Sequence, residues 1–544
     1  MKFLLRHPNM EKEAESRLSS RKSAIIGKIA AWFSSPYNRV FIAILAVAIA
    51  IRLFYFFMFK SQPLWFDEAE YMSKSKEIAF NFNWHANWSP RKPILLAWLF
   101  VPLLKIGFNE AALRFILVLF SIAAVWLAYL VAKEFFNRKI ALISSFIMAV
   151  YWVNMFFSVR FLVDMPATTL FLAALYFFAK GYIKKEKKEY LIFFGAFLAL
   201  GFLMRVSYGI FLLPFALYIF MEEKFALFKN KQLWIGVLIA FIVMLPFFIW
   251  LFNAYPQDPL GQFIGLKYGR FSIGQEHGSM GFPGIIEYLK DFPNQLKSAY
   301  FILFLFGLAL VLLDLFLEFD LIFKKGYNDA RLKFFILLWL VIAVVSFGLT
   351  RSYVEQRDSM VYAVFMFSII GVALMQIQGF IAKYSKILGI AVVMALLAYG
   401  AYSQIIYGYE MTKDKSTSYQ PVRDAGLWIK QNSNKVDGVT SKSLPQMEYY
   451  SERENYDIFT KTEEEFIGNA TMRKTRFFVP STFEPYWLVP EWSYTWGQKH
   501  PELANPVWWW IDNPEKPTQF IVVYELNLPA MEKEWKRISS NQSA

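Results

Sequence analysis

Long apolar runs recur along the chain, from about Val40 to about Tyr407. Each is about twenty residues long, and a helix of that length crosses the roughly 30 Å of hydrocarbon in a membrane. The runs are continuous rather than alternating, which favours helices over the strands of a barrel. Since 56% of the 544 residues are hydrophobic and 19% are aromatic, an ordinary soluble protein is excluded. We therefore expect a polytopic α-helical membrane protein.

Basic residues between the apolar runs set the expected orientation, because cytoplasmic loops are enriched in Lys and Arg. We predict about eleven transmembrane helices of spanning length. They lie near 40–59, 111–132, 140–158, 161–179, two within 190–220, 233–252, 299–318, 334–350, 359–379 and 387–407. Arg52 interrupts the first span and is expected to extend towards a membrane interface.

Three regions are expected. Residues 1–39 form a basic cytoplasmic segment, residues 40–407 form the membrane domain, and residues 408–544 form a soluble domain outside the cytoplasm. The loops 60–110 and 253–296 then lie on the outer side. The stretch Pro93–Leu104 is too short to span and predicts an interfacial helix.

The soluble region has the pattern of a small α/β domain. Gln420–Asn432 is amphipathic and predicts a helix, while Val436–Thr440 and Phe520–Tyr524 predict strands. The run Trp508–Trp510 predicts either a buried aromatic cluster or a membrane-facing one.

Several classes of function are excluded or lack support. The net charge of +14 comes from basic residues between spans, so we expect no nucleic-acid partner. The chain has no cysteine, which excludes disulfides, thiolate catalysis and Cys-ligated metals. No nucleotide-binding glycine pattern, HExxH motif or GxSxG motif stands in a suitable context.

Acidic residues stand beside two of the predicted spans. Asp67 and Glu68 are adjacent and follow the first span, where a carboxylate near a low-dielectric boundary can serve as a general base. A solvated loop acid or a helix cap is the alternative. Asp164 precedes Pro166 at the start of the fourth span, where it can also cap the helix. Arg160 is one turn earlier and is either a neighbour of Asp164 or a phosphate ligand.

Cations on the predicted outer side need an explanation, because positive charge is normally retained in the cytoplasm. A phosphate-bearing lipid headgroup or leaving group accounts for them as a set, although each one alone is typical of a headgroup contact. These residues are Arg91, Lys92, Arg205, Lys267, Arg270, Arg351 and Arg357. His277 lies in the predicted outer loop 253–296, and a lone histidine is more often structural than a metal ligand.

These motifs together resemble the GT-C membrane glycosyltransferases, in particular the superfamily of dolichyl-phosphate-mannose protein mannosyltransferases and aminoarabinose-lipid A transferases. The resemblance covers about residues 40–380. The matching segments, in the family's order, are Asp67–Tyr71, Arg91–Trp98, Arg160–Pro166, Gly201–Arg205 with Leu212–Pro214, and Arg270 and Phe271 followed by His277, Pro283 and Tyr288.

The resemblance implies transfer of a sugar from a polyprenyl-phosphate carrier to an acceptor on the outer face, with inversion. It implies that Asp67 is the base and that Asp164 is a second acid, with Glu68 beside them. Fixed cations would stabilise the charge that grows on the phosphate leaving group. The implied phosphate-binding residues are Lys92, Arg160, Arg205 and Arg270, and further matching positions are Tyr71, His277 and Arg357.

The chain departs from the family pattern at three points. Arg91 stands where the bacterial branch often has an acid, which disfavours a metal site built from that position and His277. A divalent ion, Mg²⁺ or Mn²⁺, remains compatible with the resemblance. Arg205 stands where lysine is usual, and Arg357 belongs to a degraded late motif.

A transporter or flippase of lipid-linked glycans is the alternative function. It would share the spans and the outer cations, but it needs ionisable residues near the membrane midplane. The acids here are predicted at the outer ends of spans, which favours an enzyme. Its expected partners are membrane lipids and an acceptor that is a protein, a lipid or a surface glycan.

Overall fold

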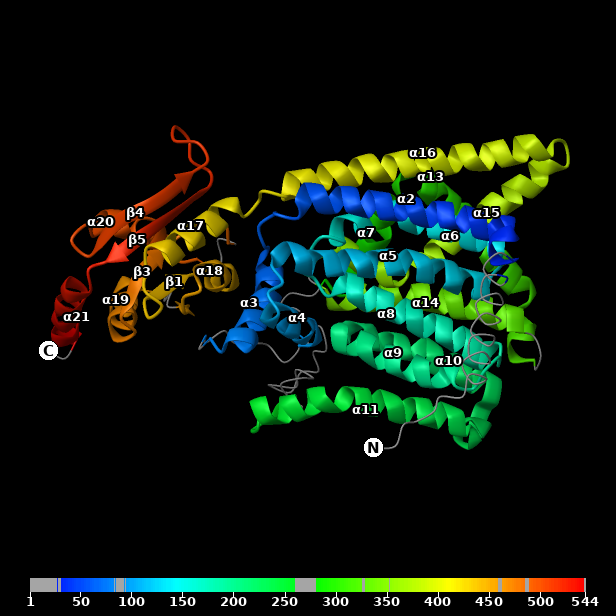
Figure 1. The fold of residues 1–544 in the computed structure, drawn as a ribbon, viewed down its shortest axis with the longest axis horizontal. Coiled ribbons are helices and arrows are strands. Elements are labelled where there is room, and N and C mark those ends of the chain that lie inside the picture. The colour runs from blue at the N-terminus through cyan, green and yellow to red at the C-terminus, as the bar shows by residue number, and fades with distance from the viewer. Residues whose placement is uncertain are drawn as a thin grey trace, which may run out of the picture.

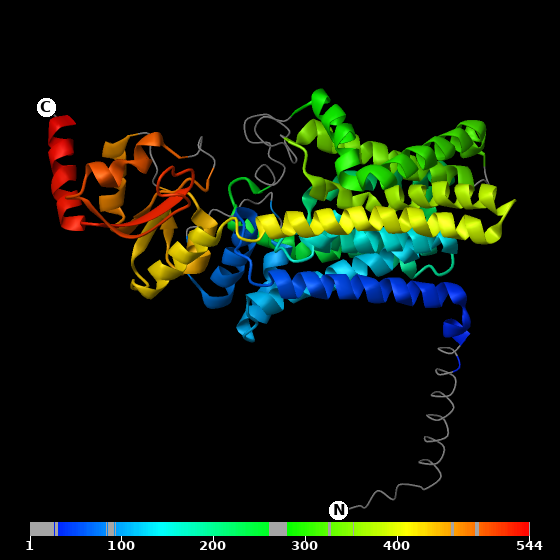
Figure 2. The ribbon, with the colours of Figure 1, turned by 90° about the horizontal axis from the view of Figure 1, so that it is seen from above.

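The computed structural model describes residue 27 and residues 31–82, 84, 92, 94–259, 280–324, 328–351, 353–457, 462–484 and 489–542. Long, roughly aligned helices from α2 (Pro36–Phe59) to α16 (Lys386–Lys415) form a bundle. A smaller mixed domain, from α17 (Gln420–Gln431) to α21 (Leu528–Gln542), lies beyond one end of that bundle (Figures 1 and 2).

Eight helices of the described chain are long and apolar enough to cross a membrane. They are α2, α5 (Glu110–Phe135), α8 (Asp164–Phe178) with the turn that follows it, α11 (Lys231–Ala254), α13 (Phe282–Leu317), α14 (Asn328–Thr350), α15 (Ala363–Ala382) and α16. Three further predicted spans coincide with the shorter helices α6 (Arg138–Val150), α9 (Tyr190–Met204) and α10 (Leu212–Glu223). The predicted polytopic helical fold is confirmed.

A break in the third predicted span explains the position of Arg52. At Tyr151 the chain leaves α6 and enters the short helix α7 (Trp152–Phe157). The last carbonyls of a helix have no intrahelical donor. Arg52 is fully buried and donates from Nη2 to the Met148 carbonyl at 3.2 Å and from Nη1 to the Ala149 carbonyl. The prediction that Arg52 extends towards an interface is therefore wrong, because these carbonyls need donors inside the bundle.

The loop after the first span contains two helices, α3 (Phe66–Phe80) and α4 (Leu95–Lys105), which pack against each other. Helix α4 coincides with the helix predicted at Pro93–Leu104. Asn81 ends α3 in the left-handed region, with φ of 55°. This local sequence therefore forms a compact helical cap on the bundle rather than an extended loop.

The predicted outer loop 253–296 is partly helical. Helix α13 begins at Phe282 and runs through a kink at Lys297, where φ is 58°. Tyr288, Phe292 and Leu296 are buried at four-residue spacing, which gives the segment before the kink one packed face. That packing explains why these residues form a helix.

The C-terminal domain is built on a five-stranded sheet with the order β2-β1-β3-β5-β4. Strand β1 is parallel to β2 and β3, and the pairs β3–β5 and β4–β5 are antiparallel. The strands are β1 (Gly438–Ser441), β2 (Asn455–Tyr456), β3 (Thr475–Val479), β4 (Ala504–Ile511) and β5 (Phe520–Leu526). The remaining helices are α18 (Leu444–Ser451), α19 (Glu463–Met472) and α20 (Trp496–Lys499). The predicted helix and both predicted strands are present.

The tryptophan run lies on the edge strand β4. Trp508 and Trp510 pack partly against the domain core, whereas Trp509 is 61% exposed. Alternate side chains of a strand point to opposite faces, so three consecutive tryptophans cannot share one core. The buried alternative is therefore wrong for Trp509, and the membrane-facing alternative stays a prediction.

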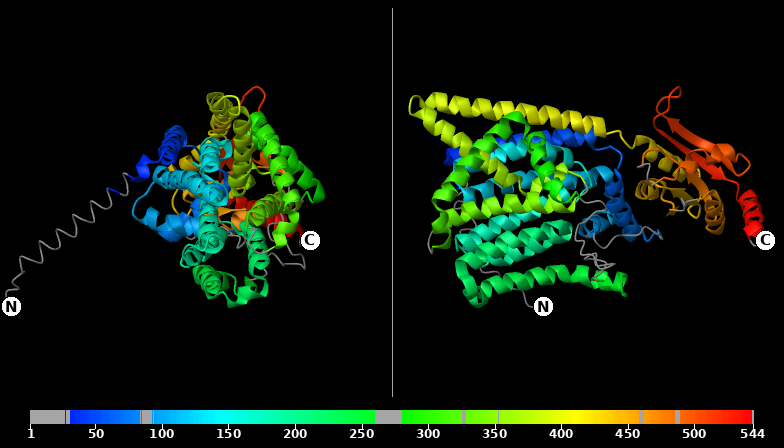
Figure 3. Two further views of the ribbon diagram at one scale, coloured as in Figure 1. Left: turned by 90° about the vertical axis from the view of Figure 1, so that its right-hand side faces the viewer. Right: turned by 180° about the vertical axis from the view of Figure 1, so that it is seen from behind.

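Direct contacts fix the C-terminal domain to α3. The Tyr450 hydroxyl of α18 accepts the N–H of Leu64 at 2.7 Å, and Ser73 donates to the Pro445 carbonyl at 2.8 Å. Lys76 donates to the Tyr449 carbonyl at 3.1 Å. Helix α3 thus lies between the bundle and the domain, as the view from behind also shows (Figure 3).

Candidate active site

The first turn of α3 carries both acids that follow the first span. Successive residues of a helix are about 100° apart, so adjacent side chains point in different directions. Glu68 points into the protein and is fully buried. Its carboxylate accepts the backbone N–H of Trp65 at 3.0 Å and that of Phe161 at 2.8 Å.

Two buried arginines complete the surroundings of Glu68. Arg160 Nη1 lies 3.2 Å from its carboxylate, and Arg114 Nη1 lies 3.4 Å from it. The Arg160 guanidinium also stacks on Trp65, 3.6 Å from the ring centroid. A buried carboxylate with two cations and two N–H donors is fully engaged, and the structure places Glu68 and Arg160 away from any open surface.

Asp67 points the other way. Its side chain is 41% exposed and lines a cavity of about 390 Å³, together with Trp65, Glu355 and Arg357. Aromatic side chains from α7 and α16 also line this cavity, including Trp152 and Tyr407. Asp67 is therefore the acid of this turn that a bound molecule can reach.

Two cations flank the Asp67 carboxylate. Arg357 Nη1 lies 3.3 Å from Oδ2, and Lys92 Nζ lies 3.6 Å from Oδ1. Lys92 also pairs with Glu70, one turn along α3. Burial disfavours the charged form of Asp67, but Lys92 and then Arg357 outweigh that effect and lower its pKa. Asp67 is accordingly ionised at neutral pH.

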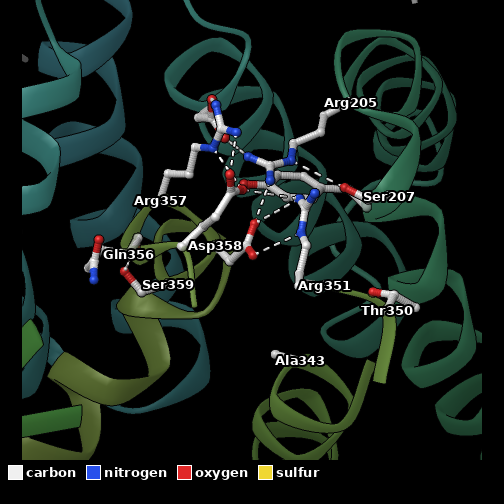
Figure 4. A network of polar contacts seen from close by, with 12 residues as sticks. Arg205, Ser207, Ala343, Thr350, Arg351, Gln356, Arg357, Asp358 and Ser359 are labelled. Carbon is white, nitrogen blue, oxygen red and sulfur yellow. Dashed lines mark hydrogen bonds and ion pairs between the residues drawn. The ribbon is translucent and has the colours of Figure 1, made fainter. Parts of the chain in front are cut away.

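A second cluster of charges surrounds Asp358, which is fully buried (Figure 4). Arg351 donates to both of its carboxylate oxygens at 3.2 Å, and the Tyr288 hydroxyl donates at 2.7 Å. Arg205 contacts the same carboxylate and, through its other terminal nitrogen, that of Asp164. Arg205 therefore joins two buried acids at the C-terminal end of α9.

Asp164 is the first residue of α8, and its neighbour Val163 occupies the cap position without a side-chain hydrogen bond. The prediction that Asp164 caps this helix is wrong, because its carboxylate faces Arg205 instead. Arg357 lies 3.9 Å from Asp164 as well as 3.3 Å from Asp67. The structure thus brings together three predicted residues, Asp67, Asp164 and Arg205, around Arg357.

Glu355 holds Arg357 in place. Its carboxylate accepts from Nε of Arg357 at 2.9 Å and from Nη2 at 2.6 Å. Burial opposes ionisation of Glu355, but Arg357 and then Arg351 lower its pKa. A bidentate pair fixes the guanidinium plane, so Arg357 presents its remaining nitrogen to Asp67 and Asp164.

Sequence reasoning missed three members of these clusters. Arg114, Glu355 and Asp358 are all buried and ion-paired. Arg114 could have been predicted from the sequence, because an ionisable residue within an apolar span usually has a structural or functional role. The charge-rich link between α14 and α15 was a weaker signal for the other two.

The remaining predicted residues have different positions. Tyr71 is buried on α3, and burial raises its pKa. Arg270 and His277 lie outside the described residues. Within the described ranges no three His, Asp or Glu side chains are grouped to hold a metal ion.

Comparison with known proteins agrees with this architecture. Residues 91–250 match a family model described as dolichyl-phosphate-mannose-protein mannosyltransferase. No curated protein matches the sequence.

Two solved structures share the fold. ArnT from Cupriavidus metallidurans bound to undecaprenyl phosphate has a TM-score of 0.61 at 15% identity, over 91% of this chain and 99% of that one. The oligosaccharyltransferase AglB from Archaeoglobus fulgidus, in complex with an inhibitory peptide and a dolichol-phosphate, has a TM-score of 0.60 at 13% identity. That match covers 83% of this chain and 70% of that one. The chain thus shares its fold with these two proteins, and its residues 91–250 are similar to the mannosyltransferase family model.

Proposed function

We propose that the protein transfers a sugar from a polyprenyl-phosphate donor to an acceptor hydroxyl or amine, with Asp67 as the general base. The exposure of Asp67 carries this proposal. Its side chain is 41% exposed on a cavity wall, whereas those of Glu68, Asp164 and Asp358 are at most 1% exposed. A general base must come within hydrogen-bond reach of the proton that it removes.

The reaction is a single displacement in this proposal. Asp67 takes the acceptor's proton as the acceptor atom bonds to the anomeric carbon, and the bond from that carbon to the phosphate oxygen breaks. The configuration inverts, and the polyprenyl phosphate leaves with the bonding electrons. The negative charge that develops on it needs fixed cations.

Lys92, Arg205 and Arg357 are the proposed phosphate ligands among the described residues, and Arg270 is retained from the sequence. Lys92 and Arg357 already contact Asp67. A donor phosphate that engages them would draw their charge away from Asp67 and raise the pKa of that carboxyl towards the range of an effective base. Donor binding therefore primes the base.

Glu68 and Arg160 have a positioning role in this proposal, because their pairing is enclosed and joins α3 to the link before α8. This replaces the base and phosphate-ligand roles that the sequence suggested for them. Asp164 positions Arg205 and Arg357.

The donor class rests on similarity. The related structures hold undecaprenyl phosphate in ArnT and dolichol-phosphate with a peptide in AglB. We infer an acceptor on the outer face, with the N-terminus in the cytoplasm, from the basic links at the opposite end of the bundle. Asp67 lies in the first turn of α3, the helix that contacts the C-terminal domain at one end of the bundle, and this supports an enzyme over a transporter.

The test compares wild-type protein with Asp67→Asn in liposomes that contain radiolabelled polyprenyl-phosphate sugars and a mixture of acceptors. We expect Asp67→Asn to lower the transfer rate by about 10²- to 10⁴-fold. Glu287→Gln, in an exposed pair on α13, is the matched control and should retain activity. Donor that crosses the membrane without transfer, equally well in both proteins, would establish the transporter instead.

A further inference from the structure

A second cavity lies at the end of the bundle opposite Asp67, where α15 turns into α16 (Figure 1). Its volume is about 780 Å³. It opens between the start of α2, the α5–α6 turn and the α15–α16 turn. Nothing in the proposed transfer reaction uses it.

The cavity is basic. Arg138, Lys139 and Lys386 line it, and its lining contains no acidic residue. None of these three cations forms an ion pair within the described part of the chain, whereas Lys184, after α8, pairs with Glu134 at 2.5 Å. The side chains of Tyr37 and Gln378 add hydrogen-bonding groups. This composition suits an anion with several oxygen acceptors.

The cavity also stands at the depth of lipid headgroups. Large aromatic side chains are exposed around it at the same end of the bundle, namely Trp32 and Phe33 before α2 and Phe380 and Tyr384 at the end of α15. Exposed aromatic side chains gather where a membrane meets water.

An apolar path leads away from the cavity along α16. Ile390 lines the cavity, and Ile387, Ile390 and Met394 are exposed at helical spacing. A free phosphate would make no use of such a path, but an acyl chain would. The geometry points to a binding site for an anionic phospholipid, with its phosphodiester held by Arg138, Lys139 and Lys386.

Gly379 of α15 allows the site to be blocked without disturbing the fold. It lines the cavity, and a Cβ added there meets no atom within 4 Å. At Gly371 on the same helix, by contrast, an added Cβ meets Ile140 at 3.0 Å. A large side chain at Gly379 therefore occupies the cavity, while one at Gly371 collides with α6.

The experiment measures binding of a short-chain phosphatidylglycerol to the full-length protein in detergent, by native mass spectrometry. Short-chain phosphatidylcholine and inorganic phosphate are the comparison probes. The charge variant is Arg138→Gln/Lys139→Gln/Lys386→Gln. Its control, Lys224→Gln/Lys229→Gln/Lys231→Gln, removes the same charge from exposed lysines beside α11 that do not line the cavity.

We expect the wild type and the control variant to bind phosphatidylglycerol equally. The charge variant and Gly379→Phe should each bind at least tenfold more weakly, because the first loses the cations that line the cavity and the second fills it. Equal weakening in the charge variant and its control would overturn the proposal, since bulk charge would then explain the binding. Competition by inorganic phosphate as strong as by the lipid would make this a free-anion site and would also overturn it.

Discussion

Asp67 and Glu68 are neighbours in the chain, yet their surroundings are opposite. Glu68 is fully buried and receives two backbone N–H groups and two guanidinium groups. Asp67 is 41% exposed, faces a cavity and meets two cations at 3.3 and 3.6 Å. A carboxylate whose oxygens all accept hydrogen bonds within the protein stabilises the fold. A carboxylate on a cavity wall can instead bind a molecule that enters the cavity. The helix N-terminus thus combines a fixed anchor and a reactive group in two residues.

The largest expected effect is a loss of stability when Glu68 is replaced, which replacement of Asp67 should not cause. Glu68→Gln removes the negative charge between Arg114 and Arg160, and breaking one side of a buried ion pair costs about 3–5 kcal/mol. We expect a clearly lower melting temperature in detergent for Glu68→Gln and little change for Asp67→Asn. Similar melting temperatures for the two variants would contradict the division of roles.

A smaller loss of stability is expected at Tyr450, which binds the backbone just before the helix that carries both acids. Tyr450→Phe removes the acceptor for the buried N–H of Leu64, just before α3, and an unsatisfied buried donor costs about 1–3 kcal/mol. Stability should fall less than in Glu68→Gln. Tyr494→Phe keeps a ring that packs on Phe520 within the C-terminal domain, so it is the control and should leave stability unchanged. Full activity with unchanged stability in Tyr450→Phe would show that the domain contact does not support α3.

The smallest expected effect is a change in the pH dependence of transfer activity, caused by a shift in the pKa of Asp67. Lys92 lowers the pKa of Asp67 against the effect of burial, so Lys92→Gln should raise that pKa. The base is then protonated at a higher pH, and the activity near pH 5 relative to that near pH 7 should fall by about two- to tenfold. Lys74→Gln, which breaks an ion pair with Glu77 elsewhere on α3, should keep the wild-type profile. An unshifted acid limb in Lys92→Gln would exclude Asp67 as the titrating base.

The sequence predicted the helices well because spanning length and apolar continuity are local properties. It predicted the adjacent acids, but it could not tell which one points inward. That choice depends on Arg114 and Phe161, which arrive from other segments. The cap predicted at Asp164 failed for the same reason, since Arg205 attracts its carboxylate.

The second cluster was harder to predict. Asp358 gains its partners from α9, α13 and the end of α14, so no spacing in the chain reveals it. The positions of Lys92, Arg205 and Arg357 between apolar runs predict outer cations. The acids with which they form ion pairs, however, depend on how the helices pack together.

The hydrogen bond from Leu64 to Tyr450 joins residues that are 386 positions apart. During synthesis α3 therefore leaves the ribosome long before the residue that secures it. A nascent or truncated chain that ends before Leu444 already contains the eight spanning helices of the described residues but cannot dock α18 on α3. The docking of α3 on α18 therefore follows the synthesis of the helix bundle.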